Sequence, residues 1–344
     1  MTRKFRSFLL IIIISFCSFN SFSQFRANKI NWTTDGNATL MIKGGDIVRT
    51  DIKTKTETIL VSAEQLVPAG ANRPLNFNIY SFSSDYKTLL IFTNTAKVWR
   101  YNTRGDYWIL DVSNNKLFQL GKTLPSQSLM YAKMSPDGKK AAYVSGHNIY
   151  SEDISSHKIT QLTVEGTRKL INGTFDWVYE EEFGCRDGFR WSPDSKKIAF
   201  WQVDARKVRD YFMLNTTDSP YSKIIPVEYP KVGEAPSPVR IGIVTVDDAN
   251  IKWMNVPGDP QQHYIPRMEW AYNSNEIVLQ QLNRKQNEST LFYCDINSGT
   301  AHNFYTEKDD AFIDIKSRWN DDDPIGWDWM NNGKQFLWVS EKDG

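Results

Sequence analysis

A degenerate repeat constrains the fold of this chain more than any other feature of the sequence. Each copy reads as an apolar strand, a turn of the form Ser-Pro-Asp-Gly-Lys and a second apolar strand. The clearest copies run from Met134 to Tyr143 and from Trp191 to Phe200. If the Asp or Asn of each turn is taken as an anchor, six copies fall at positions 35, 85, 137, 194, 273 and 332, at intervals of 50, 52, 57, 79 and 59 residues. Such intervals indicate a repeat architecture.

The residues of the repeat explain why it forms a turn between strands. Proline fixes φ at the first corner, Asp or Asn closes the turn with its side chain, and Gly or Asn tolerates a positive φ. A second strand pair follows, as in 106–112 with 116–120. Four short strands per repeat predict an all-β fold of the β-propeller type, because one blade cannot bury both of its faces alone. The sequence indicates about six blades, the last of them incomplete.

One interval is longer than the others. The 79 residues between the anchors at 194 and 273 exceed the other intervals by roughly 25 residues. The excess falls in the polar, proline-bearing segment from about Val203 to Pro238. We therefore predict a loop or hairpin extension that leaves one blade and returns to it.

Composition and charge narrow the functions that this fold could carry. Aromatic residues make up 13% of the chain, with 12 Trp, which suits strands whose wide side chains fill the space between sheets. The 41 basic and 40 acidic residues leave a net charge of +1, so no basic field is available to hold nucleic acid. The chain has four His and no Cys/His cluster with metal-ligand spacing, and we predict neither a metal site nor a cofactor.

The first 23 residues have the pattern of a secretory signal peptide. Three basic residues within the first six positions precede an apolar run from Phe8 to Phe16, and small residues stand at Ser21 and Ser23. The run is too short for a stable membrane span. A lipid anchor at Cys17 is the alternative, but the bulky Phe16 before it argues against one. We predict that cleavage leaves residues 24–344 periplasmic or secreted.

Two cysteines remain outside this segment. Cys185 and Cys294 lie 109 residues apart. A disulfide between them is permitted in an exported protein, but two distant cysteines are weak evidence for a bridge. Two buried thiols are the simpler interpretation.

The segment from Asp176 to Phe183 departs from the strand pattern. Asp176 is a suitable helix N-cap and the run Glu180 to Glu182 favours a helix, so one or two helical turns are predicted. Adjacent helical residues are turned by about 100°, so two neighbouring carboxylates can share one broad sector and accept the hydrogen bonds of one ammonium group. The alternative is a solvated acidic turn. Three aromatic residues within the segment favour a segment that is fixed in place.

This segment resembles the signature of dipeptidyl peptidase IV-type enzymes, which belong to the prolyl oligopeptidase family of serine peptidases. The matching residues are Asp-Trp-Val-Tyr-Glu-Glu-Glu at 176–182, Trp-Ser-Pro-Asp at 191–194, Tyr-Pro-Lys-Val-Gly at 229–233 and the segment 336–344. The resemblance implies an eight-bladed propeller that covers an α/β-hydrolase domain. It also implies that Glu181 and Glu182 bind the free N-terminal amine of a peptide substrate. Four motif residues would support them: Asp176, Trp177, Tyr179 and Glu180.

The pair Trp99-Arg100 matches a second feature of that family, an arginine that reaches the substrate from an early blade. The resemblance implies that Arg100 binds a substrate carbonyl. A guanidinium can also donate a fork of hydrogen bonds to the glutamate pair. A surface arginine at the end of a strand is the alternative interpretation.

No catalytic residue can be assigned. The nucleophile of the family lies in a Gly-x-Ser-x-Gly elbow with Asp and His after it, and that motif does not occur in these 344 residues. The strands also lack the alternation with helices that the elbow requires. We therefore expect the α/β-hydrolase domain to be absent from this chain, as in a fragment or a truncated product.

Three functions remain open. The first is the substrate-gating propeller of an exported enzyme that releases X-Pro or X-Ala dipeptides from peptide N-termini, with a tripeptidyl enzyme as a variant. The second is a propeller that binds free N-termini without catalysis, and the third is a scaffold for partner proteins. The glutamate pair argues against a scaffold. The sequence leaves open whether the chain forms a homodimer, as relatives in this family commonly do.

Overall fold

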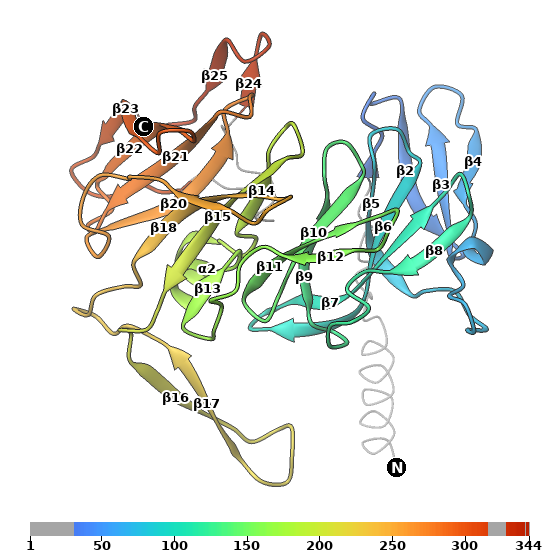
Figure 1. The fold of residues 1–344 in the computed structure, drawn as a ribbon, viewed down its shortest axis with the longest axis horizontal. Coiled ribbons are helices and arrows are strands. Elements are labelled where there is room, and N and C mark those ends of the chain that lie inside the picture. Colours follow the sequence, from blue (N-terminus) through green and yellow to red (C-terminus); the bar gives the residue numbers. More distant parts are fainter. Residues whose placement is uncertain (1–30, 316–327, 341, 344) are drawn as a thin grey trace, which may run out of the picture. The chain divides into compact units, whose positions relative to one another are not determined.

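The computed structural model describes residues 31–315, 328–340 and 342–343 (Figure 1). The predicted signal peptide at 1–23 lies outside the described residues. The described chain is built almost entirely of antiparallel strands, so the predicted all-β fold is confirmed. It divides into two compact units, with the boundary between Ala63 and Glu64.

The first unit holds one four-stranded antiparallel sheet. Its strands follow the chain order, β1 at Asn31–Trp32, β2 at Ala38–Lys43, β3 at Asp46–Asp51 and β4 at Glu57–Val61. Leu40, Ile47 and Val61 are buried and give the sheet an apolar side. The turn between β1 and β2 carries the first anchor of the repeat.

The second unit begins with two four-stranded meanders that share one sheet. A short 3-10 helix, η1 (Ala63–Leu66), precedes them. The first meander holds β5 (Phe77–Phe82), β6 (Thr88–Val98), β7 (Tyr101–Asp111) and β8 (Lys116–Gln119). The second holds β9 (Leu129–Met134), β10 (Lys140–Ser145), β11 (Asn148–Asp153) and β12 (Ile159–Gln161). The two meanders are joined by pairing between β7 and β9, where Arg104 lies opposite Met130.

The next sheet carries two insertions. Its strands are β13 (Leu170–Asn172), β14 (Phe189–Trp191), β15 (Lys197–Asp204), β18 (Val239–Thr245) and β19 (Ile251–Trp253). Helix α2 (Trp177–Phe183) lies between β13 and β14, and a hairpin of β16 (Asp210–Asn215) and β17 (Lys223–Glu228) lies between β15 and β18. The remaining strands are β20 (His263–Trp270), β21 (Glu276–Asn283), β22 (Glu288–Asp295), β23 (Ala301–Lys308), β24 (Asp328–Met330) and β25 (Gln335–Leu337).

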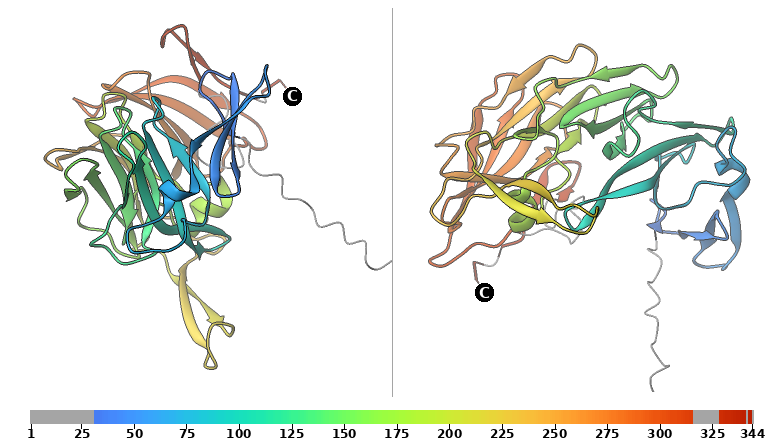
Figure 2. Two further views of the ribbon diagram at one scale, coloured as in Figure 1. Left: turned by 90° about the vertical axis from the view of Figure 1, so that its right-hand side faces the viewer. Right: turned by 90° about the horizontal axis from the view of Figure 1, so that it is seen from below.

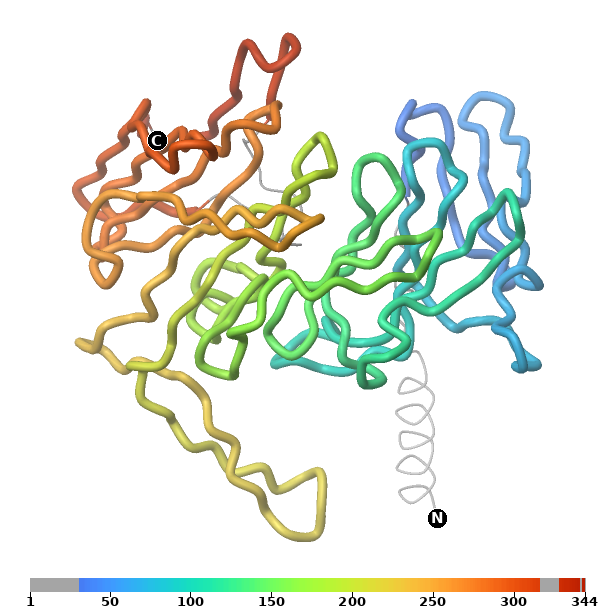
Figure 3. The backbone as a smooth tube through the Cα atoms, in the orientation of Figure 1, coloured from blue at the N-terminus to red at the C-terminus, as the bar shows by residue number. Residues whose placement is uncertain are grey.

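The β16–β17 hairpin projects from its sheet as an arm (Figure 2). Figure 3 follows the backbone out along one strand and back along the other. The predicted extension within one blade is therefore confirmed. At its base the Arg168 guanidinium contacts both Asp210 and Glu228, the paired ends of the two strands. Apolar side chains along the arm are exposed, among them Phe212 and Leu214.

The six anchors of the repeat all lie in turns between two paired strands. They are Asp35, Asp85, Asp137, Asp194, Asn273 and Asn332. In the two clearest copies, Ser135 donates to Asp137 Oδ1 at 2.7 Å and Ser192 donates to Asp194 Oδ1 at 2.6 Å. The aspartate side chain therefore closes the turn, as predicted. The propeller fold is confirmed, and the number of blades stays a prediction.

Neighbouring strand groups are joined by indole hydrogen bonds that recur along the chain. Trp191 Nε1 donates to the Lys133 carbonyl at 3.2 Å. One group later, Trp270 Nε1 donates to the Arg190 carbonyl at 3.1 Å. In both cases the acceptor lies four residues before the anchor of the preceding group, so the tryptophans of the repeat fix how each of these groups meets the one before it.

A second set of bonds runs in the opposite direction. The Asp137 backbone N–H donates to Ser195 Oγ at 3.0 Å, and the Asp194 backbone N–H donates to Ser274 Oγ at 3.0 Å. At each of these two junctions, the later group therefore donates one hydrogen bond to the earlier group and accepts one from it. The residues of the turn join neighbouring groups as well as shaping the turn itself.

The largest hydrophobic cluster includes side chains of α2 and of the strands around it. Tyr179, Trp201 and Met268 are among its buried members. Cys185 and Cys294 also belong to it, and both are buried thiols that are not joined in a disulfide, which confirms the simpler interpretation. Burial raises the pKa of the Cys294 thiol to about 12, so that thiol stays protonated.

Candidate amine-binding site

Helix α2 is fixed at both ends by hydrogen bonds. Asp176 has an extended backbone, and its Oδ1 accepts from the Tyr179 N–H at 3.1 Å, which confirms the predicted N-cap. Its Oδ2 accepts from Ser237 Oγ at 2.6 Å. Burial raises the pKa of Asp176, although both hydrogen bonds oppose the rise. At the other end Gly184 takes the left-handed conformation with φ 64°, and the Cys185 N–H donates to the Tyr179 carbonyl at 3.0 Å.

The aromatic residues of the motif anchor the helix. Tyr179 is fully buried, and its hydroxyl oxygen accepts from the Ile265 N–H at 3.1 Å. Phe183 is also buried, with its ring centroid 5.2 Å from that of Tyr179. Trp177 packs on Tyr229, just after the arm, at 4.4 Å between centroids. The expectation that these rings hold the segment in place is confirmed, and a freely solvated acidic turn is excluded.

The three consecutive glutamates lie in three different environments. Glu180 is buried, and its Oε1 contacts Arg186 Nε at 3.2 Å. Glu181 is bound by Arg100 in a fork, with Nε to Oε1 at 2.9 Å and Nη2 to Oε2 at 2.8 Å. Glu182 is exposed and makes no hydrogen bond or ion pair among the residues that the structure describes. Of the three, Glu182 alone presents a carboxylate whose charge no described partner offsets.

Arg100 reaches Glu181 from a hairpin tip 81 residues earlier in the chain. Val98 and Tyr101 are paired across β6 and β7, so Trp99 and Arg100 form a two-residue turn. The Arg100 side chain is 70% exposed. It is therefore both a surface arginine at a strand end and a partner of the motif glutamate, so the two interpretations of this residue are compatible.

A polar network at the base of this hairpin was not anticipated from the sequence. The buried Asp106 accepts from Asn94 Nδ2 at 2.7 Å and from the Gln127 backbone N–H at 2.7 Å. Gln127 Nε2 in turn donates to Asn94 Oδ1 at 2.8 Å. The network ties the hairpin to the loop before β9. The only signal in the sequence is an aspartate at the edge of the apolar strand residues 107–110.

Arg186 forms a second bridge between the hairpin and the helix segment. Its guanidinium lies 4.1 Å from the ring centroid of Tyr101, the residue after Arg100. The same side chain contacts Glu180, so the hairpin and the end of α2 meet at two places. Sequence reasoning missed Arg186. A cation just beyond a helix C-terminus, which favours positive charge, is the signal that could have revealed it.

Glu182 lies within electrostatic range of a tyrosine–arginine pair on the neighbouring sheet. Tyr264 of β20 is buried, and the Arg284 guanidinium lies 5.6 Å from its ring centroid. Burial is the main cause that raises the pKa of Tyr264; Arg284 opposes the rise and the Glu182 carboxylate adds to it. This pair lies more than 80 residues from the motif along the chain, and no sequence pattern connects the two.

The arrangement suits a primary ammonium group. An ammonium offers three hydrogen-bond donors, and the carboxylates of Glu181 and Glu182 only accept. Arg100 offsets one of their two negative charges, so the three groups together carry one net negative charge. Within the described ranges, no group of three or more His, Cys, Asp or Glu side chains could hold a metal ion. The same part of the chain contains no helix that is long and apolar enough to cross a bilayer.

The sequence is similar to a known family over most of its length. Residues 83–344 match the profile of the dipeptidyl peptidase IV (DPP IV) N-terminal region. Prolyl endopeptidase FAP of Mus musculus is 30% identical over 272 residues, which cover 77% of this chain and 35% of the relative. The inactive dipeptidyl peptidase 10 of Rattus norvegicus is 27% identical over 320 residues, which cover 91% of this chain and 38% of the relative.

The fold is similar to that of a solved peptidase. The crystal structure of Porphyromonas gingivalis dipeptidyl peptidase 4 matches with a TM-score of 0.77 and 28% sequence identity, over 84% of this chain and 41% of that one. The chain therefore spans less than half the length of each of these relatives. The likeness in sequence and the likeness in fold point to the same group of proteins as the motif at 176–182.

Proposed function

Because the chain belongs to the dipeptidyl peptidase IV N-terminal region family, we propose that it is the substrate-gating propeller of an exported serine dipeptidyl peptidase. Residues 24–344 form this propeller after cleavage of a signal peptide, in the periplasm or outside the cell. The full-length enzyme carries an α/β-hydrolase domain and releases X-Pro or X-Ala dipeptides. The observation that carries the proposal is the Arg100 fork on Glu181, which leaves the neighbouring Glu182 without an ion pair among the described residues.

The proposed role of the site is to select free N-termini. The substrate ammonium donates to the carboxylates of Glu181 and Glu182, and Glu182 supplies the net charge that attracts it. Arg100 holds Glu181 in one orientation through two contacts, which reduces the ordering that substrate binding requires. A nucleophile at a fixed distance from this clamp then cuts after a fixed number of residues. Because Arg100 is largely exposed, it can also donate to a substrate carbonyl.

Calorimetric titration with a Gly-Pro peptide tests this role. We expect the free peptide to bind and its N-acetylated form to lose at least about tenfold in affinity, since a charged hydrogen bond contributes roughly 1.5–3 kcal/mol. The Glu181→Gln/Glu182→Gln double variant should lose a similar amount. Glu57→Gln is the matched control, because Glu57 is an exposed, lysine-paired glutamate in the other unit. Equal binding of the free and acetylated peptides would exclude the amine clamp.

The pH dependence of the same titration gives a second readout. An N-terminal amine has a pKa near 8, so the ammonium form is lost above about that pH. Binding should therefore weaken as the pH rises from about 7 to about 9.5. Affinity that stays constant over this range would contradict an ammonium ligand.

A propeller that binds free N-termini without catalysis is the second candidate function. The likeness to inactive dipeptidyl peptidase 10 over 91% of this chain favours it. Cleavage of a Gly-Pro chromogenic amide by the full-length gene product separates the two candidates. Turnover supports the peptidase, whereas binding of the free peptide without turnover supports the second candidate.

The arm supports a homodimer as a further element of the proposal. Phe212, Leu214 and Ile224 are all more than 60% exposed, and such a patch on a projecting hairpin marks an interaction surface. Sedimentation of the Phe212→Asp/Leu214→Asp variant should give a smaller species than the unmodified chain. An unchanged sedimentation coefficient would remove the arm from the dimer contact.

A further inference from the structure

A buried guanidinium that lacks a carboxylate partner contacts the end of α2. Arg267 of β20 is only 9% exposed. Its Nη1 donates to the Pro266 carbonyl at 2.7 Å and contacts Cys185 Sγ at 3.2 Å, and its Nη2 donates to the Phe183 carbonyl at 3.1 Å. Its Nε has no acceptor in the part of the chain that the structure describes. A buried cation without a counter-charge is costly, so this site lacks one negative charge.

Two carboxylates close to Arg267 in the chain or in the cavity lining, Glu269 and Asp187, are engaged by other cations. Asp187 binds Lys133 through both of its oxygens and lies 3.5 Å from Arg190 Nη1. Glu269 accepts from Arg190 Nε at 2.7 Å. Neither carboxylate forms an ion pair with Arg267 in the described structure, so they do not offset its charge.

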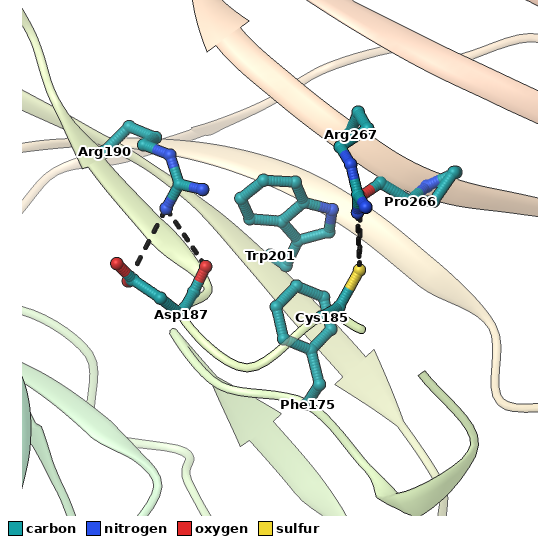
Figure 4. Close-up of a pocket in the computed structure, with 7 residues that line it drawn as sticks. All are labelled: Phe175, Cys185, Asp187, Arg190, Trp201, Pro266 and Arg267. Atoms are coloured by element: carbon teal, nitrogen blue, oxygen red, sulfur yellow. Dashed lines mark hydrogen bonds and ion pairs between the residues drawn. The ribbon is translucent and has the colours of Figure 1, made fainter. Parts of the chain in front are cut away.

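A small cavity lies beside Arg267, Arg190 and Asp187 (Figure 4). Its lining includes the guanidinium groups of Arg190 and Arg267, the rings of Phe175 and Trp201, the Cys185 thiol, and the Asp187 carboxylate that Lys133 and Arg190 already bind. Its volume is about 10 Å³, enough for one group of about the size of a water molecule. A carboxylate, phosphate or peptide group is too large to enter.

We propose that this cavity binds a single halide ion, chloride in the cell. A monatomic anion supplies the negative charge that the site lacks in the most compact form available. It accepts a hydrogen bond from Arg267 Nε and offsets the unmatched charge of the guanidinium. A water molecule would satisfy the Nε donor and leave the charge unmatched.

The halide site is adjacent to the helix that carries the glutamates. Phe183 is the last residue of α2, and its carbonyl accepts from the same guanidinium that faces the cavity. An anion that fixes Arg267 therefore also supports the last turn of the helix. The halide proposal does not depend on the amine clamp, because it rests on the charge balance around Arg267 and on the cavity beside it.

Crystals of the unmodified chain in sodium bromide test the site directly. We expect an anomalous-scattering peak beside Arg267 Nε, and a cavity without such a peak overturns the proposal. Thermal unfolding gives a measurement in solution. Raising chloride from about 5 mM to about 300 mM, with gluconate keeping the ionic strength constant, should raise Tm by roughly 2–4 °C.

Two arginine variants separate this site from general salt effects. Arg267→Gln should abolish the chloride-dependent rise in Tm, because the amide keeps hydrogen-bonding capacity but removes the charge. Arg240→Gln is the matched control: Arg240 stacks on Trp253 at 3.5 Å and does not line the cavity. It should keep the full rise. A chloride response of equal size in Arg267→Gln and the unmodified chain overturns the proposal; if Arg267→Gln does not fold, the bromide measurement decides.

Discussion

Helix α2 and the β16–β17 arm are insertions into the same sheet. The helix buries its apolar side chains, whereas the arm exposes them to solvent. In the helix, Tyr179 and Phe183 stand four residues apart on one face, and both are buried. In the arm, Phe212 and Leu214 alternate along a two-stranded ribbon that has no third strand to cover it. The buried face of the helix leaves its glutamates in fixed positions, whereas the arm offers its apolar residues to a partner.

The two insertions also begin with aspartates in contrasting environments. Asp176, at the start of α2, is buried, and burial raises its pKa. Asp210, at the start of the arm, is held by hydrogen bonds from Arg168, which lower its pKa. One aspartate thus belongs to the interior and the other to an exposed ion pair. This contrast implies that packing in the interior stabilises the helix, whereas ion pairs at its base stabilise the arm.

We expect the largest difference between the two insertions when one aromatic side chain in each is truncated and the loss in the free energy of unfolding is compared. Tyr179→Ala should lower the free energy of unfolding by about 3–5 kcal/mol, since it removes a fully buried ring. Phe212→Ala should change it by less than about 0.5 kcal/mol, because that ring is 66% exposed. Urea unfolding followed by tryptophan fluorescence measures both. Similar losses in the two variants would show that the arm is packed in solution.

Loss of the helix cap should have an intermediate effect. Asp176→Ala removes the acceptor for the Tyr179 N–H and should cost about 0.5–2 kcal/mol in the free energy of unfolding. If the cap positions the glutamates, the affinity for a free peptide N-terminus should fall as well. Asp176→Asn is the control, because an amide oxygen also caps a helix. An alanine variant that binds the peptide like the unmodified chain would show that the cap is dispensable for the site.

A fall in pH should change the contributions of the two aspartates to stability in opposite directions. Of the three effects on stability, we expect this one to be the smallest. Asp210 has a folded pKa below its unfolded value, so it stabilises the fold above about pH 3.8 and loses this contribution as the pH falls through the folded pKa. Asp176 has a folded pKa above its unfolded value, so its contribution improves as the pH falls toward about 3.8.

Urea unfolding of Asp210→Asn and Asp176→Asn between about pH 3 and pH 6 measures these contributions. The stability of Asp210→Asn should fall less with acid than that of the unmodified chain, and the stability of Asp176→Asn should fall more. Shifts of the same sign in both variants would contradict the contrast between the two insertions.

The sequence predicted those features whose causes are local. The bond from Ser135 to Asp137 spans two residues, and the bond from the Tyr179 N–H to Asp176 spans three. Both can therefore be inferred from residue type and spacing. The arm was predicted for a related reason, because an excess of chain between two anchors must leave the sheet and return. That its strands would expose their apolar side chains depends on the absence of a covering layer, which no local pattern encodes.

The sequence alone could not show that the three glutamates lie in three different environments. Glu181 finds its partner 81 residues away, at the tip of another hairpin. The Glu182 carboxylate contributes to the raised pKa of Tyr264, which belongs to a different sheet. Only the completed fold decides which neighbour reaches which carboxylate. Resemblance to a family pointed to Arg100 as a residue of the site, and it gave no indication of Arg186 or Asp106.

The indole hydrogen bonds that Trp191 and Trp270 donate both run from the later strand group to the earlier one, and this has a consequence for assembly. Trp270 donates to the carbonyl of Arg190 as Trp191 donates to that of Lys133, so the group that contains Arg190 and Trp191 donates an indole N–H to one neighbour and accepts one from the other. Such head-to-tail contacts, unlike two-fold ones, do not stop at a pair. A group in one chain meets the same complementary surface on an equivalent group of another chain. Exchange of whole strand groups between molecules is therefore the misassembly to which this architecture is most open.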